Sequence, residues 1–225
     1  MEYSKSEKVI IFLESLRKNY PKFRGMVVRF NFFPAQYLHP TRRKNYFNGK
    51  LIDSAWDVDK LNARISPLIL SEHCLDGRPY LQFPDPNWSL ALLSRERFSR
   101  LALFVGASLC GPQVRACLSR DQVLVWREKL GDDAFNFAVN SRLLFSNDLF
   151  LMNIDSSSDI QEIGYFLIES SLKNIAPEMQ KRISLKLPSE IFDYSVEVSI
   201  AKKIVNSVFF VLEAEWHSLF KSIHH

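Results

Sequence analysis

The 225-residue sequence predicts an all-α protein, an irregular multi-helix globular fold that ends in a long C-terminal helix. Two kinds of pattern predict it. Apolar residues recur at helical spacing in most segments, and Ser, Asp, Pro and Gly mark helix starts and stops between them. The composition agrees, because 47% of the residues are hydrophobic and the 18 Phe, 7 Tyr and 4 Trp can fill a large core.

The first helix is predicted over residues 5–19 and ends at Tyr20, because the residue before a proline is pushed out of the α region. Its inward residues are Val9, Phe12, Leu13 and Leu16. Residues 26–33 are rich in β-branched and aromatic side chains, which leaves a strand and a buried helical turn as alternatives. An exposed connection is predicted next, marked by Pro34, His39, Pro40 and the basic run Arg42, Arg43 and Lys44.

A second helix is predicted over residues 55–72, and Pro67 is expected to interrupt or bend it. Turn residues then cluster over 76–88, the best linker candidate in the chain. The helical signal is strong from Ser89 onward. Its inward set is Leu90, Leu93, Phe98, Leu101, Phe104, Val105 and Leu109.

Helix starts and stops divide the rest of the chain. Gly111-Pro112 separates two helices, and Ser119–Gln122 reads as a capping box that opens a helix to about Lys129. Leu130–Asp132 is predicted to stop that helix and cap a new one over Ala134–Phe145, with Phe135, Ala138 and Leu143 inward.

The C-terminal part holds three further predicted helices. Ser158–Gln161 reads as a second capping box, and the helix that follows ends before Pro177. A short helix begins at Pro177 and stops at Pro188. The last helix, about Ser195 to Lys221, would be roughly 39 Å long at 1.5 Å per residue. Its apolar stripe is wide, so a central core helix and a partner-facing helix are both open interpretations.

Length and turn signals predict one helical domain over residues 26–225, preceded by a helical extension over 1–25. A sub-boundary near 76–88 is the alternative.

The net charge of +4 is unevenly distributed. Residues 1–60 hold 12 Lys and Arg against 6 Asp and Glu, and residues 131–180 hold 2 against 8. Such asymmetry suits head-to-tail contacts in an assembly. The alternative interpretation is that the charges only solvate two faces.

Three cysteines, Cys74, Cys110 and Cys117, form an odd count that fits a reducing compartment better than a disulfide framework. No signal-peptide pattern and no apolar run of about 18 residues occurs in the sequence. The sequence therefore predicts a cytoplasmic protein without direct membrane insertion.

The sequence shows no pattern of a chemical centre, so we expect no catalytic residue, no metal ligand and no cofactor. The seven glycines are scattered rather than clustered to cradle phosphate, and no closely spaced Cys or His pairs form a zinc pattern. Two rivals stay open: an unrecognised hydrolase that uses His39 or His73 as its base, and a nucleic-acid-binding regulator. The second would use Arg42–Lys44 with Tyr46 and Phe47, where basic and aromatic residues interleave.

Three blocks of sequence resemble one known family. Arg29–His39 reads RFNFFPAQYLH and resembles the RFxxxPAxYLH signature near the start of the SctK family, also called YscK, PscK, OrgA or MxiK. Leu101–Leu118 resembles the family's central block, and Lys181–Pro188 a third block. The order and spacing of the blocks agree, so the resemblance covers about residues 26–220. The chain departs from the family pattern in its first 25 residues and in a basic 41–50 loop.

The resemblance implies a non-enzymatic, all-helical cytoplasmic adaptor of the type III secretion sorting platform, peripheral to the inner-membrane base of the injectisome. Its implied partners are the cytoplasmic domain of the ring protein SctD and the C-ring-like pod protein SctQ, and indirectly SctL and the ATPase SctN. No nucleic acid is expected.

We predict one partner contact on the turn and basic run at Pro34, Tyr37, Leu38, His39, Arg42, Arg43 and Lys44. Fold packing is the alternative role for Pro34, Tyr37 and Leu38. A second contact is predicted at Ser156–Ile160, in acidic surroundings.

Overall fold

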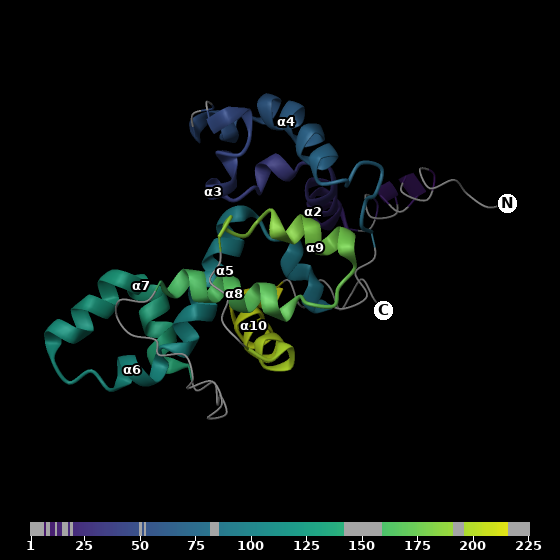
Figure 1. Cartoon of the computed structure of the whole chain (residues 1–225). Coiled ribbons are helices and arrows are strands. Elements are labelled where there is room, and N and C mark those ends of the chain that lie inside the picture. The colour runs from purple at the N-terminus through teal and green to yellow at the C-terminus, as the bar shows by residue number, and fades with distance from the viewer. Residues whose placement is uncertain are drawn as a thin grey trace. The chain divides into compact units, whose positions relative to one another are not determined.

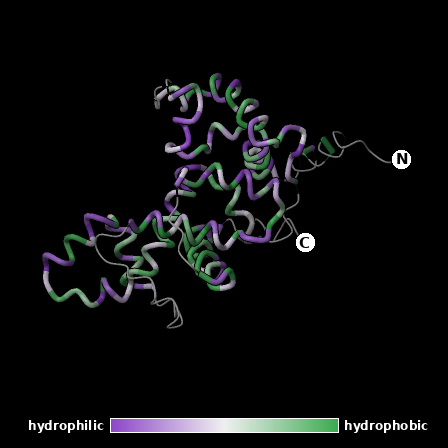
Figure 2. The backbone as a smooth tube through the Cα atoms, in the orientation of Figure 1, coloured by the Kyte–Doolittle hydropathy of each residue, from purple (hydrophilic) through white to green (hydrophobic). Residues whose placement is uncertain are grey.

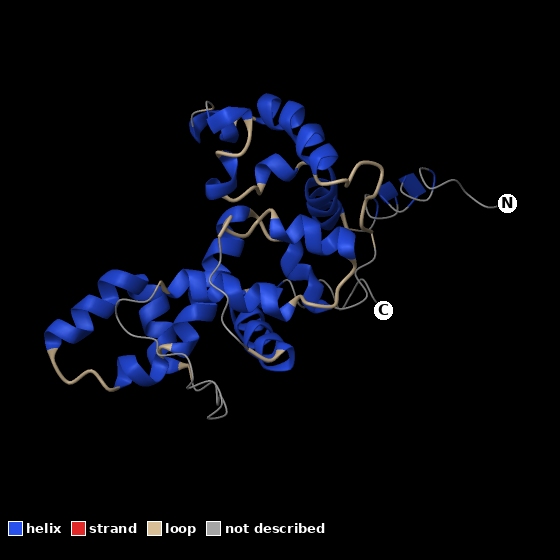
Figure 3. Cartoon of the chain, in the orientation of Figure 1, coloured by secondary structure: helices blue, strands red, loops and turns tan. Residues whose placement is uncertain are grey.

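The computed structural model describes residues 7, 10–11, 13–14, 18, 20–49, 51, 53–81, 86–141, 159–190 and 196–215. These residues form helices, turns and loops without a β-strand (Figure 3), which confirms the all-α prediction. Within the described part of the chain, no helix is long and apolar enough to cross a membrane.

The chain divides into two compact units, which are described separately. Unit 1 comprises the described residues of Met1–Arg95 and Ile175–Ser189, and unit 2 those of Glu96–Asn174 and Glu190–Ser222. The predictions of an extension over 1–25 and of one domain over 26–225 stay predictions.

Unit 1 is built from short helical elements, labelled in Figure 1 where there is room. They are α2 (Pro21–Phe32), η1 (Pro34–Gln36), α3 (Pro40–Arg43), η2 (Phe47–Gly49), η3 (Asp53–Asp57), α4 (Asp59–Glu72), η4 (Pro86–Leu92) and α9 (Pro177–Ser184). α4 packs against η1 and η3, and α2 packs against η1 and η4. The largest buried apolar side chains are Phe23, Phe30, Tyr37, Leu38, Trp56, Ile65, Ile69 and Leu75.

α2 resolves the ambiguity over residues 26–33 in favour of a helix. Pro21 lies at its start, where the missing N–H costs nothing and the fixed φ favours the helical conformation. The six residues described between positions 7 and 18 are also helical.

One local prediction in unit 1 is wrong. The connection after α2 is not exposed throughout, because Pro34, Tyr37, Leu38 and Arg43 are buried. Of the two effects predicted for Pro67, interruption is contradicted, because α4 continues past this exposed proline to Glu72, whereas a bend stays a prediction.

Unit 2 is built from α5 (Arg95–Leu109, whose first residue belongs to unit 1), α6 (Gly111–Arg115), α7 (Arg120–Asn140), α8 (Ile160–Ser171) and α10 (Val198–Leu212). α8 and α10 form the most extensive helix pair, and hydrophobic residues dominate α10 (Figure 2). α6 packs against α7.

The helix boundaries of unit 2 test the start and stop signals. Ser119 and Gln122 form the predicted capping box with both reciprocal hydrogen bonds. Gly131 lies at φ 72°, ψ 162°, so the helical geometry of α7 breaks where a stop was predicted. α7 ends at Asn140, five residues before the predicted end, and Leu143 lies outside the described residues.

The described bounds of two later helices differ from the predicted ones. The N-cap of α8 is Asp159, whose carboxylate accepts a hydrogen bond from the Glu162 amide at 3.0 Å, one residue later than predicted. α10 covers only 15 residues, and Trp216–Lys221 lie outside the described residues. Within α10, Ile204 and Val208 are buried as expected, whereas Val211 is exposed.

Helices α5 and α8 cross at unusually close range through two glycines. A Cβ atom on Gly106 would lie 1.9 Å from the carbonyl oxygen of Ile160. A Cβ atom on Gly164 would lie 1.7 Å from the carbonyl oxygen of Ala102. Each helix thus places a glycine against the backbone of the other, one turn apart, and a side chain at either position would force the helices apart.

Candidate interaction site in the basic unit

The seven residues predicted to contact a partner lie in unit 1 and differ in accessibility. Pro34, Tyr37, Leu38 and Arg43 are buried, His39 and Arg42 are half-buried, and Lys44 is exposed. The burial of Pro34, Tyr37 and Leu38 therefore agrees with their alternative role, which is packing within the fold. Partner binding by any of the seven stays a prediction.

Tyr37 lies at the centre of this region. Its hydroxyl donates a hydrogen bond to the carbonyl oxygen of Phe30 at 2.8 Å, and the two rings stack at 6.0 Å. The ammonium of Lys186 lies 4.8 Å from the Tyr37 ring centre and 5.8 Å from that of Phe30. Burial raises the pKa of Tyr37 far above its usual value, while the charge of Arg182 opposes the shift.

The segment that follows α9 is hydrogen-bonded to the predicted site. The backbone amide of His39 donates to the Leu185 carbonyl at 2.8 Å. Arg42 donates through Nε to the Leu187 carbonyl at 2.8 Å and through Nη2 to the Pro188 carbonyl at 2.9 Å. The first and third family-like blocks, far apart in sequence, therefore pack together, and much of the hydrogen-bonding capacity of Arg42 serves the fold.

His39 has a structural role as the N-cap of α3. Its Nδ1 accepts a hydrogen bond from the Thr41 amide at 3.3 Å and lies 2.9 Å from the Thr41 hydroxyl. Burial, reinforced by the positive charges of Arg42 and Arg95, lowers the pKa of His39 to about 4. The ring is neutral at pH 7, as this acceptor role requires.

His73, the other histidine considered as a base, lies at the end of α4. Its Nε2 is 3.1 Å from the Tyr46 hydroxyl, and its carbonyl accepts a hydrogen bond from Lys181 at 3.1 Å. Burial lowers the pKa of His73, with Glu72 opposing and Arg42 and Lys181 adding to the shift. Among the described residues, no group of three His, Cys, Asp or Glu is placed to hold a metal ion.

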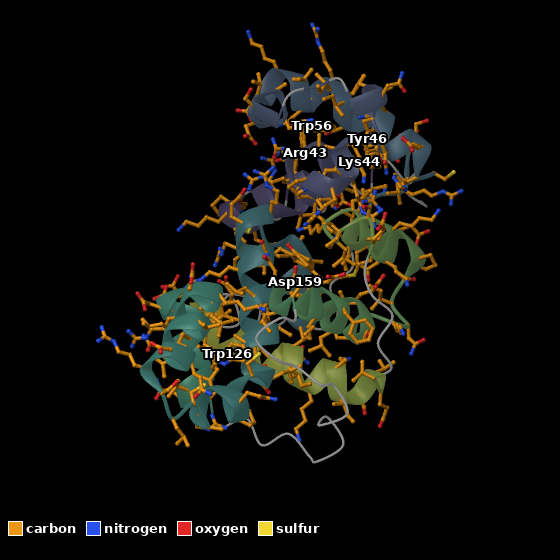
Figure 4. The ribbon with its side chains drawn as sticks, turned by 60° about the vertical axis from the view of Figure 1, so that its left-hand side comes forward. Arg43, Lys44, Tyr46, Trp56, Trp126 and Asp159 are labelled. Carbon is orange, nitrogen blue, oxygen red and sulfur yellow. The ribbon has the colours of Figure 1, made fainter. Side chains whose placement is uncertain are left out.

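Arg43 fixes the chain that follows α3. Its guanidinium lies 5.4 Å from the Trp56 ring centre, and Tyr46 meets the same ring edge-on at 6.2 Å. Figure 4 shows Arg43, Lys44, Tyr46 and Trp56 together in one part of the chain. The contact between Trp56 and Arg43 has no signature in the local sequence.

The buried charges of the described residues are all basic, and all three lie in unit 1: Arg43, Arg182 and Lys186. Arg182 donates to the carbonyls of Glu178 and Arg78 at 3.1 and 3.0 Å. Burial lowers the pKa of Arg182, although Tyr37 and Glu178 counteract that effect. Sequence analysis did not single out Arg182 and Lys186, because the pattern marks them only as part of the Lys181–Pro188 block.

The two units carry opposite net charges. Over its full sequence ranges, unit 1 holds 18 Lys and Arg against 10 Asp and Glu, whereas unit 2 holds 11 against 15. The net charges are therefore +8 and −4. At the second predicted contact, Asp159 is exposed and Ile160 is buried, while Ser156–Ser158 lie outside the described residues.

Residues 26–206 match the family model described as "YOP proteins translocation protein K (YscK)". No curated protein and no solved structure matched the chain. The matched range is most of the chain and contains the first block and the third block that pack together in unit 1.

Proposed function

The chain belongs to the YscK family of type III secretion proteins, and from this premise we propose that it is a non-enzymatic cytoplasmic adaptor of the sorting platform. In this role it links the cytoplasmic domain of SctD to SctQ at the inner-membrane base of the injectisome. SctL and the ATPase SctN take part indirectly.

The family match over residues 26–206 carries the proposal. The division into two units of opposite net charge supports it, because an adaptor needs separate surfaces for different partners. Complementary potentials speed encounter with the correct partner and disfavour the wrong one. The environments of His39 and His73 also suit structural roles, since one histidine caps a helix and the other contacts a tyrosine.

The test is reconstitution with the purified full chain, the cytoplasmic domain of SctD and SctQ. We expect a binary complex with each partner and a ternary complex when all three are mixed. Failure of the folded chain to bind either protein would refute the adaptor role. Substitution of His39 or His73 by Ala in the native cell tests the alternative that the protein is a hydrolase. That alternative predicts that the variant loses function in secretion while it remains folded.

A further inference from the structure

The turn after α3, residues 44–49, has a backbone that its sequence does not favour. Phe47, Asn48 and Gly49 lie in succession at φ 54°, 54° and 70°. Glycine and asparagine adopt the left-handed region readily. A phenylalanine there is strained, because its Cβ lies close to the following carbonyl oxygen.

The ring of Phe47 is only partly buried. Phe47 is 45% exposed, whereas its neighbour Tyr46 is buried. A strained backbone that presents a large apolar side chain to solvent is typical of functional sites, where the strain serves pre-organisation. The observation is specific to Phe47, since the other non-glycine residues described with positive φ are Asn48, Cys74 and Asn174.

The turn is firmly anchored on one side, so Phe47 is held in place. Arg43 and Tyr46 both contact the Trp56 ring, at 5.4 and 6.2 Å, and the Tyr46 hydroxyl lies 3.1 Å from His73 (Figure 4). Burial and the charge of Glu72 raise the pKa of Tyr46 to about 12, so its phenol stays neutral. The Gly49 amide closes the turn by donating to the Tyr46 carbonyl at 3.0 Å.

The charge of this region indicates the kind of partner. Lys44, the first residue of the turn, is exposed. Between Glu14 and Asp53 the sequence carries nine Lys and Arg and no Asp or Glu; Arg43 is buried and Arg42 half-buried, whereas Lys22, Arg29 and Lys44 are exposed. Exposed basic residues in a unit of net charge +8 attract an acidic partner, and an exposed aromatic side chain beside Lys44 offers an apolar anchor with a charged rim.

We propose that the 44–49 turn is a docking tip, in which Phe47 enters an apolar pocket on an acidic protein surface and Lys44 supplies a rim charge. The inference rests on the proposed adaptor function, which makes the partner a protein. It places the contact of unit 1 on Lys44 and Phe47 rather than on the buried Pro34, Tyr37 and Leu38.

The experiment measures dissociation constants of the full chain with the SctD cytoplasmic domain and with SctQ. Phe47→Asn removes the ring and keeps a residue that tolerates positive φ. Val58→Gly is the matched control, because Val58 is also about half exposed in unit 1 and lies at the N-cap of α4, where glycine is accepted. Thermal unfolding of each variant accompanies the binding data.

We expect Phe47→Asn to weaken binding to at least one of the two proteins roughly ten-fold or more, as loss of an aromatic hot spot does. Its unfolding midpoint should equal or exceed that of the wild type, since strain is relieved, and Val58→Gly should bind normally. Lys44→Glu should weaken the same complex at low salt and less at high salt.

If the wild type binds and Phe47→Asn binds with unchanged dissociation constants, the docking tip is refuted and the adaptor function is not affected. A wild-type chain that binds neither protein would remove the adaptor function and this inference together. A lowered unfolding midpoint in Phe47→Asn would show a structural role instead. Phe47-dependent sedimentation with phosphatidylserine–phosphatidylcholine vesicles, combined with unchanged protein binding, would identify a lipid surface and overturn the proposal.

Discussion

Substitution of Gly164 by alanine tests the close crossing of α5 and α8. At an open helical position this change stabilises a protein by up to about 1 kcal/mol, because alanine has the higher helix propensity. At Gly164 the new Cβ would lie 1.7 Å from the Ala102 carbonyl oxygen, whereas ordinary contact begins near 3.4 Å. The obstacle is backbone, which cannot rotate away as a side chain would.

The helices must therefore separate by most of that difference, and contacts such as the stacking of Phe98 on Tyr165 at 6.3 Å weaken. Overpacking of a tight core costs about 1–3 kcal/mol. We expect the upper end of that range, so that Gly164→Ala lowers the free energy of unfolding by about 2 kcal/mol after the propensity gain. For a chain of this size, that is a fall of roughly 4–8 °C in the unfolding midpoint.

Gly25→Ala is the matched control, because Gly25 lies inside α2 and a Cβ there would meet nothing within 4 Å. Urea and thermal unfolding, followed by helical circular dichroism, should show the control stabilised and Gly164→Ala destabilised. Gly106→Ala should be destabilising too. The double variant should cost less than the sum, because helices already separated accommodate the second methyl group. Equal shifts of the same sign at positions 25 and 164 would contradict the described crossing.

Three further predictions concern stability. His39 has a folded-state pKa lowered to about 4, so its contribution to the free energy of unfolding is complete above the unfolded-state pKa near 6.5 and is lost as the pH falls towards 4. His39→Asn keeps a capping oxygen but does not titrate in this range. It should therefore reduce the fall in unfolding midpoint that the wild type shows between pH 7 and pH 4. Asn31 is buried; its side-chain oxygen accepts from the Tyr80 amide at 2.6 Å and its side-chain nitrogen donates to the Tyr80 carbonyl at 2.9 Å. Asn31→Leu should therefore lower the free energy of unfolding, measured in urea, by about 2–3 kcal/mol. An unchanged midpoint would count against this pairing. Ser119→Ala removes the capping box of α7 and should cost about 1 kcal/mol, whereas Ser119→Asp should restore most of it.

Local signals in the sequence predicted what local chemistry decides. Ser119 and Gln122 make a capping box because both partners lie within four residues, and Pro177 begins α9 because proline fits a helix start. The same reasoning was less accurate where tertiary contacts decide. Pro67 lies within α4 without interrupting it, and the N-cap of α8 is one residue later than predicted.

The sequence predicted a contact region but not which of its side chains are accessible. The RFNFFPAQYLH block directed the prediction to residues 29–39 and the basic run after them, yet nothing in the pattern shows that Tyr37 and Leu38 are buried while Phe47 is exposed. Residues 185–189, which lie far away in sequence, hydrogen-bond to the His39 and Arg42 region, and no local pattern predicts that contact. The positive φ of Phe47 cannot be predicted from the sequence either, because Asn48 and Gly49 signal a left-handed turn but a phenylalanine does not.

The opposite charges of the two units come mostly from sequence segments, and topology adds a smaller share. The acidic sequence window 131–180 contains Glu178, yet α9 and the residues after it return to unit 1 and add three basic residues, Lys181, Arg182 and Lys186. Two of these are buried beside aromatic rings or backbone carbonyls, where each charge is costly unless its contacts offset the loss of water. The buried basic residues Arg182 and Lys186 serve the packing of α9 and the segment after it. Lys44 is exposed and makes no comparable contact among those described. A partner attracted by the charge of unit 1 must therefore contact its exposed lysines and arginines. Charge reversal at Lys44 tests docking more directly than reversal at Arg42 or Arg43, because reversal at those two residues would also disturb the fold.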